Sequence, residues 1–161
     1  MLSRKGLNMS DEFKITLAQL NATVGDLSGN NQKVMEAWEI ARDEATDLIA
    51  FPEMFITGYN PQDLILKNAF QKAATSSIEQ IAAACSQGPA IAVGGPFCDG
   101  DKLYNSYYIL AGGKIQAVIK KHHLPNEEVF DEVRLFSSGN VDGPFQIGTM
   151  RIGSPICEDA W

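Results

Sequence analysis

The sequence predicts an α/β fold in which a sheet is layered with helices. Segments with alternating or continuous apolar character, typical of strands, alternate with segments that place apolar residues at three- and four-residue steps, typical of helices. Hydrophobic residues make up 45% of the 161 residues and charged residues 20%, as in a globular protein with one sizeable core. The order strand, helix, strand, helix, strand, followed by several further strands, is typical of α/β or α+β proteins.

The first half of the chain contains two predicted strands and two predicted helices in alternation. Residues 14–20 alternate apolar and polar side chains, as a half-buried strand does, and residues 47–51 form a short apolar run that ends at a proline. Residues 31–46 and 63–87 place apolar side chains along one face at helical spacing, and a Gly-Pro pair ends the second helix.

The second half is predicted to be rich in strands. A third apolar strand is followed by a hairpin, whose two strands flank Ala111-Gly112-Gly113. A long polar loop over 121–143 separates this hairpin from a last strand pair around Gly148. The predicted strands of this half are 90–94, 104–110, 114–120, 145–147 and 150–156.

The two ends of the sequence carry separate expectations. We expect residues 1–11 to form a disordered leader, because Met9-Ser10-Asp11 has the form of a second start, and residues 12–161 to form the folded part. No predicted helix or strand follows the last strand pair before Trp161. The fold is therefore expected to be incomplete at its C-terminal end.

The net charge limits the kinds of molecule that the protein can bind, and the cysteine content indicates its cellular compartment. Thirteen basic and twenty acidic residues give a net charge of −7, which argues against binding to nucleic acid or to an anionic membrane surface. No apolar run approaches the roughly 18–20 residues that span a bilayer, and no secretory signal follows the first basic residues. The three cysteines lack the spacing of a disulfide framework, so we expect reduced thiols and a cytoplasmic protein.

Three reactive or ionisable residues each follow a predicted strand, where loops held by a rigid sheet often carry active groups: Glu53, Lys121 and Cys157. A partly buried Glu53 would suit proton transfer, and Lys121 would stabilise a developing negative charge. Cys157 would present a nucleophilic sulfur. Because Glu158 and Asp159 beside it oppose a thiolate, it needs a positive partner or a nearby base.

Each of these residues also has a structural interpretation. Glu53 fits a carboxylate at a helix N-terminus, Lys121 a solvated basic cluster, and Cys157 an inert buried thiol. The adjacent His122-His123 pair does not predict a metal site, because neighbouring side chains seldom face one ion and no spaced Cys or acidic ligands accompany them. No metal site or phosphate-binding loop is therefore predicted.

Taken together, the three residues occur in the order Glu, Lys, Cys, each within a local motif. This pattern resembles the nitrilase (carbon–nitrogen hydrolase) superfamily, which uses a Glu-Lys-Cys triad in that order. Within the superfamily, residues 13–161 are most similar to the glutaminase domains of glutamine-dependent NAD synthetases. The segments that carry the resemblance are Phe51-Pro52-Glu53-Met54, Lys121-His122-His123-Leu124-Pro125 and Ile156-Cys157-Glu158-Asp159-Ala160-Trp161, together with 18–21, 24–26, 57–64 and 124–132.

The resemblance implies a fold and a reaction. The fold would be the αββα sandwich of nitrilases, of which residues 12–161 form the N-terminal portion. Glu53 would be the general base, and Lys121 would stabilise the tetrahedral intermediate. Cys157 would attack the side-chain amide of L-glutamine, or of another small amide, and form a thioester. Members of the superfamily usually associate through their domain faces, so a homo-oligomer is expected.

The resemblance also implies how the substrate and the product are handled. We expect Glu127 and Glu158 to contact the substrate. Glu127 stands where this branch usually has a tyrosine, and its carboxylate would meet the α-ammonium of glutamine without supplying an aromatic wall. The ammonia would pass to a second domain that amidates nicotinate adenine dinucleotide. ATP and Mg²⁺ belong to that domain, so no cofactor is expected in this one.

Two alternatives to this function stay open on the sequence. One is a stand-alone amidase of the same fold, which releases ammonia to solvent. The other is a catalytically inert fragment or scaffold, in which Cys157 would be no more reactive than Cys98. The acidic charge and the intact Glu-Lys-Cys order favour the enzyme for the longer parent protein.

Overall fold

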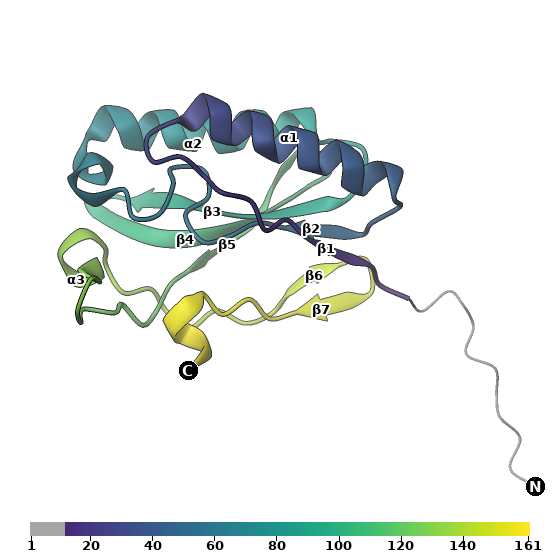
Figure 1. Ribbon diagram of the computed structural model, residues 1–161. Coiled ribbons are helices and arrows are strands. Elements are labelled where there is room, and N and C mark those ends of the chain that lie inside the picture. Colours follow the sequence, from purple (N-terminus) through teal and green to yellow (C-terminus); the bar gives the residue numbers. More distant parts are fainter. Residues whose placement is uncertain (1–11) are drawn as a thin grey trace, which may run out of the picture.

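The computed structural model describes residues 12–161, and its centre is a five-stranded sheet (Figure 1). The expected leader, 1–11, lies outside the described residues. The strands follow one another across the sheet in chain order, with β1, β2 and β3 parallel and β4 and β5 antiparallel to their neighbours. Their bounds are β1 Ile15–Leu17, β2 Leu48–Ala50, β3 Ala90–Asp99, β4 Lys102–Ala111 and β5 Lys114–Lys120.

Two helices, α1 (Leu27–Asp43) and α2 (Asn68–Ala84), cover one face of this sheet (Figure 1). Helix α1 begins four residues before the predicted start. The carboxylate of Asp26 accepts a hydrogen bond from the backbone N–H of Gly29 at 2.9 Å, and this cap extends the helix into the predicted loop.

The prediction of a single helix over 63–87 is wrong. A short 3₁₀ helix, η2 (Gln62–Leu66), comes first, and α2 begins only at Asn68. Between them Lys67 adopts an extended conformation, with ψ of 114°, so the helical hydrogen bonds cannot continue through it. Apolar spacing alone did not reveal this break, because both segments present apolar residues at helical steps.

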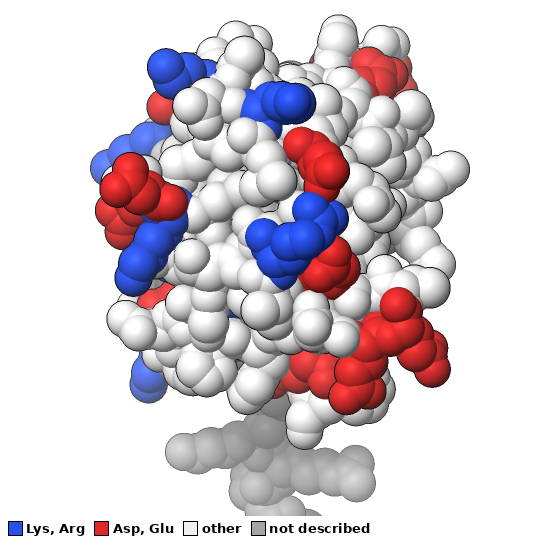
Figure 2. All heavy atoms as spheres, turned by 90° about the vertical axis from the view of Figure 1, so that its left-hand side faces the viewer, with Lys and Arg blue, Asp and Glu red and all other residues white. Residues whose placement is uncertain are grey.

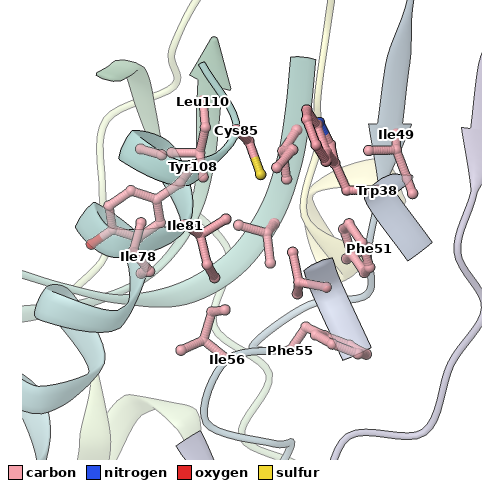
Figure 3. Packing of buried hydrophobic residues seen from close by; sticks show 14 of the residues in the cluster. Trp38, Ile49, Phe51, Phe55, Ile56, Ile78, Ile81, Cys85, Tyr108 and Leu110 are labelled. Atoms are coloured by element: carbon pink, nitrogen blue, oxygen red, sulfur yellow. The ribbon is translucent and has the colours of Figure 1, made fainter. Parts of the chain in front are cut away.

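The main core lies between the two helices and the sheet (Figure 3). Aromatic and branched side chains from both layers meet there, and Trp38 of α1 donates its indole N–H to the carbonyl of Pro89 at 3.0 Å. This bond ties α1 to the start of β3. The labelled members of the core in Figure 3 are Trp38, Ile49, Phe51, Phe55, Ile56, Ile78, Ile81, Cys85, Tyr108 and Leu110.

The opposite face of the sheet carries a small second sheet, formed by β6 (Phe145–Ile147) and β7 (Met150–Ile152) (Figure 1). Phe145, Ile147 and Ile152 pack against a second apolar cluster on the underside of β2 to β5. The predicted strand 150–156 therefore stops earlier than expected, at Ile152. The order of layers is helices, large sheet, small sheet, as expected for the N-terminal portion of a nitrilase-like sandwich.

Two short helical turns complete the described chain on this lower side. Helix α3 (Glu132–Leu135) interrupts the predicted loop 121–143, and the 3₁₀ helix η3 (Cys157–Ala160) follows the second sheet. Within the described range 12–161, none of the helices has the length and apolar character needed to cross a membrane.

Candidate active site

Glu53 lies in a tight turn three residues beyond the end of β2. The turn is held against β3, because the N–H of Phe51 donates to Ala92 O at 2.8 Å and that of Ile56 to Gly94 O at 3.1 Å. The approach is so close that a Cβ on Gly94 would overlap the backbone N of Met54. Only glycine fits there, and the turn leaves the side chain of Glu53 19% exposed.

Lys121 comes directly after β5 and is completely buried. Its backbone is held on both sides, since its N–H donates to Asn105 O at 2.9 Å and its carbonyl accepts from Gly139 N at 2.8 Å. The ammonium Nζ lies 2.8 Å from Oε1 of Glu53. The structure thus brings together two of the three predicted site residues, although 68 residues separate them in the sequence, and the solvated basic interpretation of Lys121 is wrong.

Glu132, at the start of α3, is a site residue that the sequence analysis missed. It is 1% exposed, and its carboxylate oxygens lie 2.9 and 3.0 Å from Nζ of Lys121. The hydroxyl of Tyr59 donates to Glu132 Oε1 at 3.0 Å. A possible signal was the pair Leu135-Phe136, apolar residues one helical turn after Glu132 within a loop that otherwise looks polar.

Asn105, inside β4, was also missed, and it links the two carboxylates. Its amide Nδ2 lies 2.7 Å from Oε1 of Glu53 and 3.4 Å from Oε1 of Glu132. The side chain is fully buried. A buried asparagine in the middle of an apolar strand needs hydrogen-bond partners, so its position in the predicted strand 104–110 was the available signal.

The charges in this cluster change the proton affinities of Lys121 and Glu132. Burial alone would lower the pKa of Lys121, but the carboxylates of Glu53 and Glu132 outweigh burial and raise it above its usual range. Burial raises the pKa of Glu132, and the repulsion from Glu53 adds to it, while Lys121 opposes the shift. The lysine is therefore a firmly protonated ammonium between two acidic side chains.

Cys157 is the first residue of η3 and has an exposed side chain, so it is not an inert buried thiol. It lines a small cavity of about 180 Å³ together with Glu53, Phe51 and Tyr107. Burial and the charge of Glu53 raise the pKa of its thiol, whereas Lys121 and the backbone N–H of Glu158 lower it. The third predicted residue therefore shares this cavity with Glu53, and its thiol lies close enough to Glu53 and Lys121 for both charges to act on it.

Cys157 also lines a larger cavity of about 920 Å³. Glu127 and Glu158, the two residues expected to contact the substrate, both line it, as do Phe130 and Trp161. With Glu128, which also lines it, the cavity combines three carboxylates with aromatic surface, and it reaches Cys157. The carboxylates suit a substrate with a cationic group.

Within residues 12–161 no group of three or more His, Cys, Asp or Glu side chains is arranged to hold a metal ion. The ring of His122 contacts Gly139 O at 2.7 Å, and that of His123 contacts Asp159 at 3.2 Å, so both histidine rings already have partners within the protein.

On the face shown in Figure 2, basic and acidic side chains are interspersed, and acidic ones gather at the lower right.

The proteins to which this chain is similar include glutamine-dependent NAD(+) synthetases. The glutamine-dependent NAD(+) synthetase of Rhodobacter capsulatus is 49% identical over 153 residues, which cover 95% of this chain and 28% of that protein. The enzyme of the same name from Thermotoga maritima is 39% identical over 151 residues, covering 92% of this chain and 26% of that protein. The chain thus spans little more than a quarter of the length of these relatives.

Solved structures show the same fold. The glutamine-dependent NAD+ synthetase from Acinetobacter baumannii, in complex with ADP, superposes with a TM-score of 0.83 at 33% identity, covering 92% of this chain and 28% of that one. An amidase from Nesterenkonia sp. superposes with a TM-score of 0.73 at 22% identity, covering 86% of this chain and 53% of that one, and shares the fold.

A family model described as carbon-nitrogen hydrolase matches residues 14–161. The matched region contains the whole sheet from β1 to β5, both covering helices and the buried Lys121 between its two carboxylates. Because this match extends over nearly all of the described residues, the chain belongs to the carbon–nitrogen hydrolase family.

Proposed function

We propose that this chain carries the site that hydrolyses the side-chain amide of glutamine and releases ammonia. The observation that carries the proposal is the buried ammonium of Lys121, 2.8 Å from Glu53, beside a cavity that Glu53 shares with Cys157. A thiol, a base and a fixed cation around one cavity are what amide cleavage through a covalent intermediate requires. The names of the relatives support glutamine as the amide.

In the first half of the reaction, the Cys157 sulfur attacks the carbonyl carbon of the amide while the carboxylate of Glu53 takes the thiol proton. Lys121 stabilises the negative charge that develops on the carbonyl oxygen. The carbon–nitrogen bond then breaks, Glu53 returns the proton to the leaving nitrogen, and ammonia departs. A thioester between Cys157 and the γ-carbonyl remains.

In the second half, water replaces ammonia. Glu53 takes a proton from the water as the water oxygen attacks the thioester carbon, and Lys121 again stabilises the oxyanion. The carbon–sulfur bond breaks, the proton returns to the sulfur, and glutamate leaves. Protons and electron pairs balance over both halves, so no cofactor is needed in this domain.

Glu132 and Asn105 support these steps without touching the substrate in this proposal. Glu132 keeps Lys121 protonated and fixes its Nζ, and Asn105 donates to Oε1 of Glu53. Because Lys121 and Asn105 both bond to Oε1, the second oxygen of Glu53 is the one available to the thiol. The carboxylate of Glu53 therefore accepts the thiol proton on a defined oxygen, Oε2.

The carboxylates of Glu127 and Glu158 are proposed to receive the α-ammonium of glutamine. Both line the large cavity that opens onto Cys157. The longer relatives are named glutamine-dependent NAD(+) synthetases, so their ammonia would serve the amidation that makes NAD. We propose the same use for the ammonia made at this site.

The test is covalent labelling followed by an ammonia assay. An electrophilic glutamine analogue, such as a chloroketone, should add once to the chain, and the Cys157→Ala variant should not be labelled while Cys98→Ala is labelled as before. Glu53→Gln and Lys121→Met should slow labelling and abolish ammonia release from glutamine. Labelling of Cys98 and Cys157 at equal rates would identify an inert scaffold, and hydrolysis of neutral amides in preference to glutamine would identify a general amidase.

A further inference from the structure

The short turn η3, which carries Cys157, makes its hydrogen bonds to other segments of the described chain through one carboxylate, that of Asp159. Asp159 Oδ1 accepts from the backbone N–H of His123 at 2.7 Å, and both of its oxygens lie 3.2 Å from the backbone N of His122. The ring Nδ1 of His123 lies a further 3.2 Å from Oδ1. Asp159 therefore binds the backbone N–H groups of two consecutive residues, although 36 residues separate it from His123 in the sequence.

The two groups that Asp159 binds directly follow Lys121. Other hydrogen bonds of residues 157–161 in the described chain are local, such as Asp159 N to Ile156 O at 3.1 Å and Trp161 N to Glu158 O at 3.2 Å. Asp159 thus supplies all the hydrogen bonds that join this turn to another segment of the described chain. Its side chain is 14% exposed, so these bonds are largely shielded from water.

We propose that Asp159 is a positioning residue, which holds the Cys157 turn against the segment carrying Lys121 and so keeps the thiol facing Glu53. The inference rests on the proposed function, in which Cys157 must meet both charged groups. It assigns to Asp159 a role different from the electrostatic opposition that its sequence position suggests. The charge of Asp159 is directed at backbone donors of residues 122 and 123.

A carboxylate suits this position better than an amide. Bonds from backbone N–H groups to an ionised acceptor are stronger than those between neutral groups, and both oxygens of an aspartate accept. Asparagine has the same shape and keeps one accepting oxygen, but it loses the negative charge, and its NH₂ group would face the N–H of His122 where Oδ2 now accepts. Asp159→Asn therefore weakens the attachment with little change in volume.

The chain offers a matched control in Asp142. Its Oδ2 also accepts from a backbone N–H next to the site, that of Lys120 at 3.3 Å, but it makes no bond to the Cys157 turn. Cys98, an exposed thiol on β3, is an internal reference within the same molecule. Asp142→Asn and Asp159→Asn thus differ in whether they release the turn.

Two readouts test the proposal on the full chain. Hydrogen exchange at the amides of His122 and His123 should become at least about tenfold faster in Asp159→Asn and stay unchanged in Asp142→Asn. The pH profile of iodoacetamide alkylation, measured by peptide mapping, should shift downward at Cys157 only. Release relieves the burial and the Glu53 charge that raise the pKa of this thiol.

The outcomes separate this proposal from the proposed function. Faster exchange together with a shifted Cys157 profile, at an unchanged Cys98 profile, supports the positioning role. Faster exchange with the wild-type Cys157 profile overturns it, and so does unchanged exchange. Glu53→Gln is measured in parallel, because a Cys157 profile unaffected by that change would contradict the catalytic base while the Asp159 variants still decide the attachment.

Discussion

The two neighbouring lysines, Lys120 and Lys121, differ completely in environment. Lys121 is fully buried between Glu53 and Glu132, whereas Lys120 pairs with the exposed Asp99 at 3.1 Å. Removing one member of a buried ion cluster leaves uncompensated charge and costs about 3–5 kcal/mol. We expect Lys121→Met to lower the free energy of unfolding in urea by this amount. Lys120→Met should change it by no more than about 1 kcal/mol, and equal effects would contradict the buried cluster.

The same cluster predicts the pH dependence of stability. The pKa of Lys121 is raised on folding, so its contribution is fully present below its usual value of 10.5 and is lost as pH rises through the raised value. In Lys121→Met the sign stays the same, but the pH dependence moves to the acidic range, because Glu132 then has a raised pKa with no cation opposite it. The folded variant binds protons more readily than its unfolded chain. Urea midpoints of Lys121→Met should therefore increase from pH 8 to about pH 5 relative to wild type.

Glu127 and Glu158 provide a prediction about substrate selection. Both line the cavity next to Cys157, and each would lose one attractive charge on conversion to glutamine. We expect Glu127→Gln and Glu158→Gln to raise KM for glutamine by about five- to tenfold, or about 1–1.4 kcal/mol, with kcat within about twofold. Steady-state ammonia assays with glutamine and with a neutral amide of similar length measure this. An equal rise of KM for the neutral amide would exclude recognition of the α-ammonium.

The sequence predicted the site residues that stand in a recognisable local motif. It did not predict the residue whose role depends only on contacts with distant segments. Glu53 and Lys121 stand directly after strands in recognisable motifs, and the structure places them 2.8 Å apart. Glu132 lies in a segment that looks like a polar loop, and its role depends on Lys121 and on Tyr59 from distant segments. No local pattern encodes those contacts, so the second carboxylate could not be found by spacing.

At the scale of elements, the contact between β3 and the Glu53 turn is set by a single glycine. A Cβ at Gly94 would overlap Met54 N, so alanine forces the turn away from the strand. A Cβ at Gly143 would meet nothing within 4 Å, which makes this glycine a matched control. We expect Gly94→Ala to cost about 1–3 kcal/mol or more in urea unfolding, with slower labelling of Cys157, and Gly143→Ala to be nearly neutral. Equal stability of both variants would contradict this packing.

The elements themselves were predicted well in type and less well in extent. Apolar periodicity located both helices and the strands of the large sheet, because one face of each is buried. Their ends depend on local bonds that periodicity does not report. The side-chain cap at Asp26 lengthens α1, and the extended Lys67 separates η2 from α2. The strand after Gly148 is short because only Met150–Ile152 pair with β6.

At the scale of the whole molecule, several large apolar side chains of the described chain are exposed to solvent. Leu17 on the edge strand β1 is 77% exposed, and Val129 and Val141 on the lower side are 79% and 78% exposed. On the upper face, Ile40 of α1 is 62% exposed. The sheet order places β1 at an edge whose outer backbone groups have no strand partner among residues 12–161. An unpaired edge with an apolar side chain favours pairing with another chain.

This edge predicts self-association by strand pairing, which differs from the association through domain faces that the family resemblance implies. We expect the purified chain to sediment above its monomer mass, with the mass rising with concentration. Leu17→Lys should reduce the association, because a charged side chain on an edge strand disfavours pairing. Ile40→Lys is the matched control, since it removes a comparably exposed apolar side chain from a helix with no unpaired edge. A monomer at all concentrations would contradict self-association. If both variants dissociated the chain equally, the association would depend on exposed apolar surface in general. Pairing at the β1 edge predicts that only Leu17→Lys, which lies on β1, has this effect.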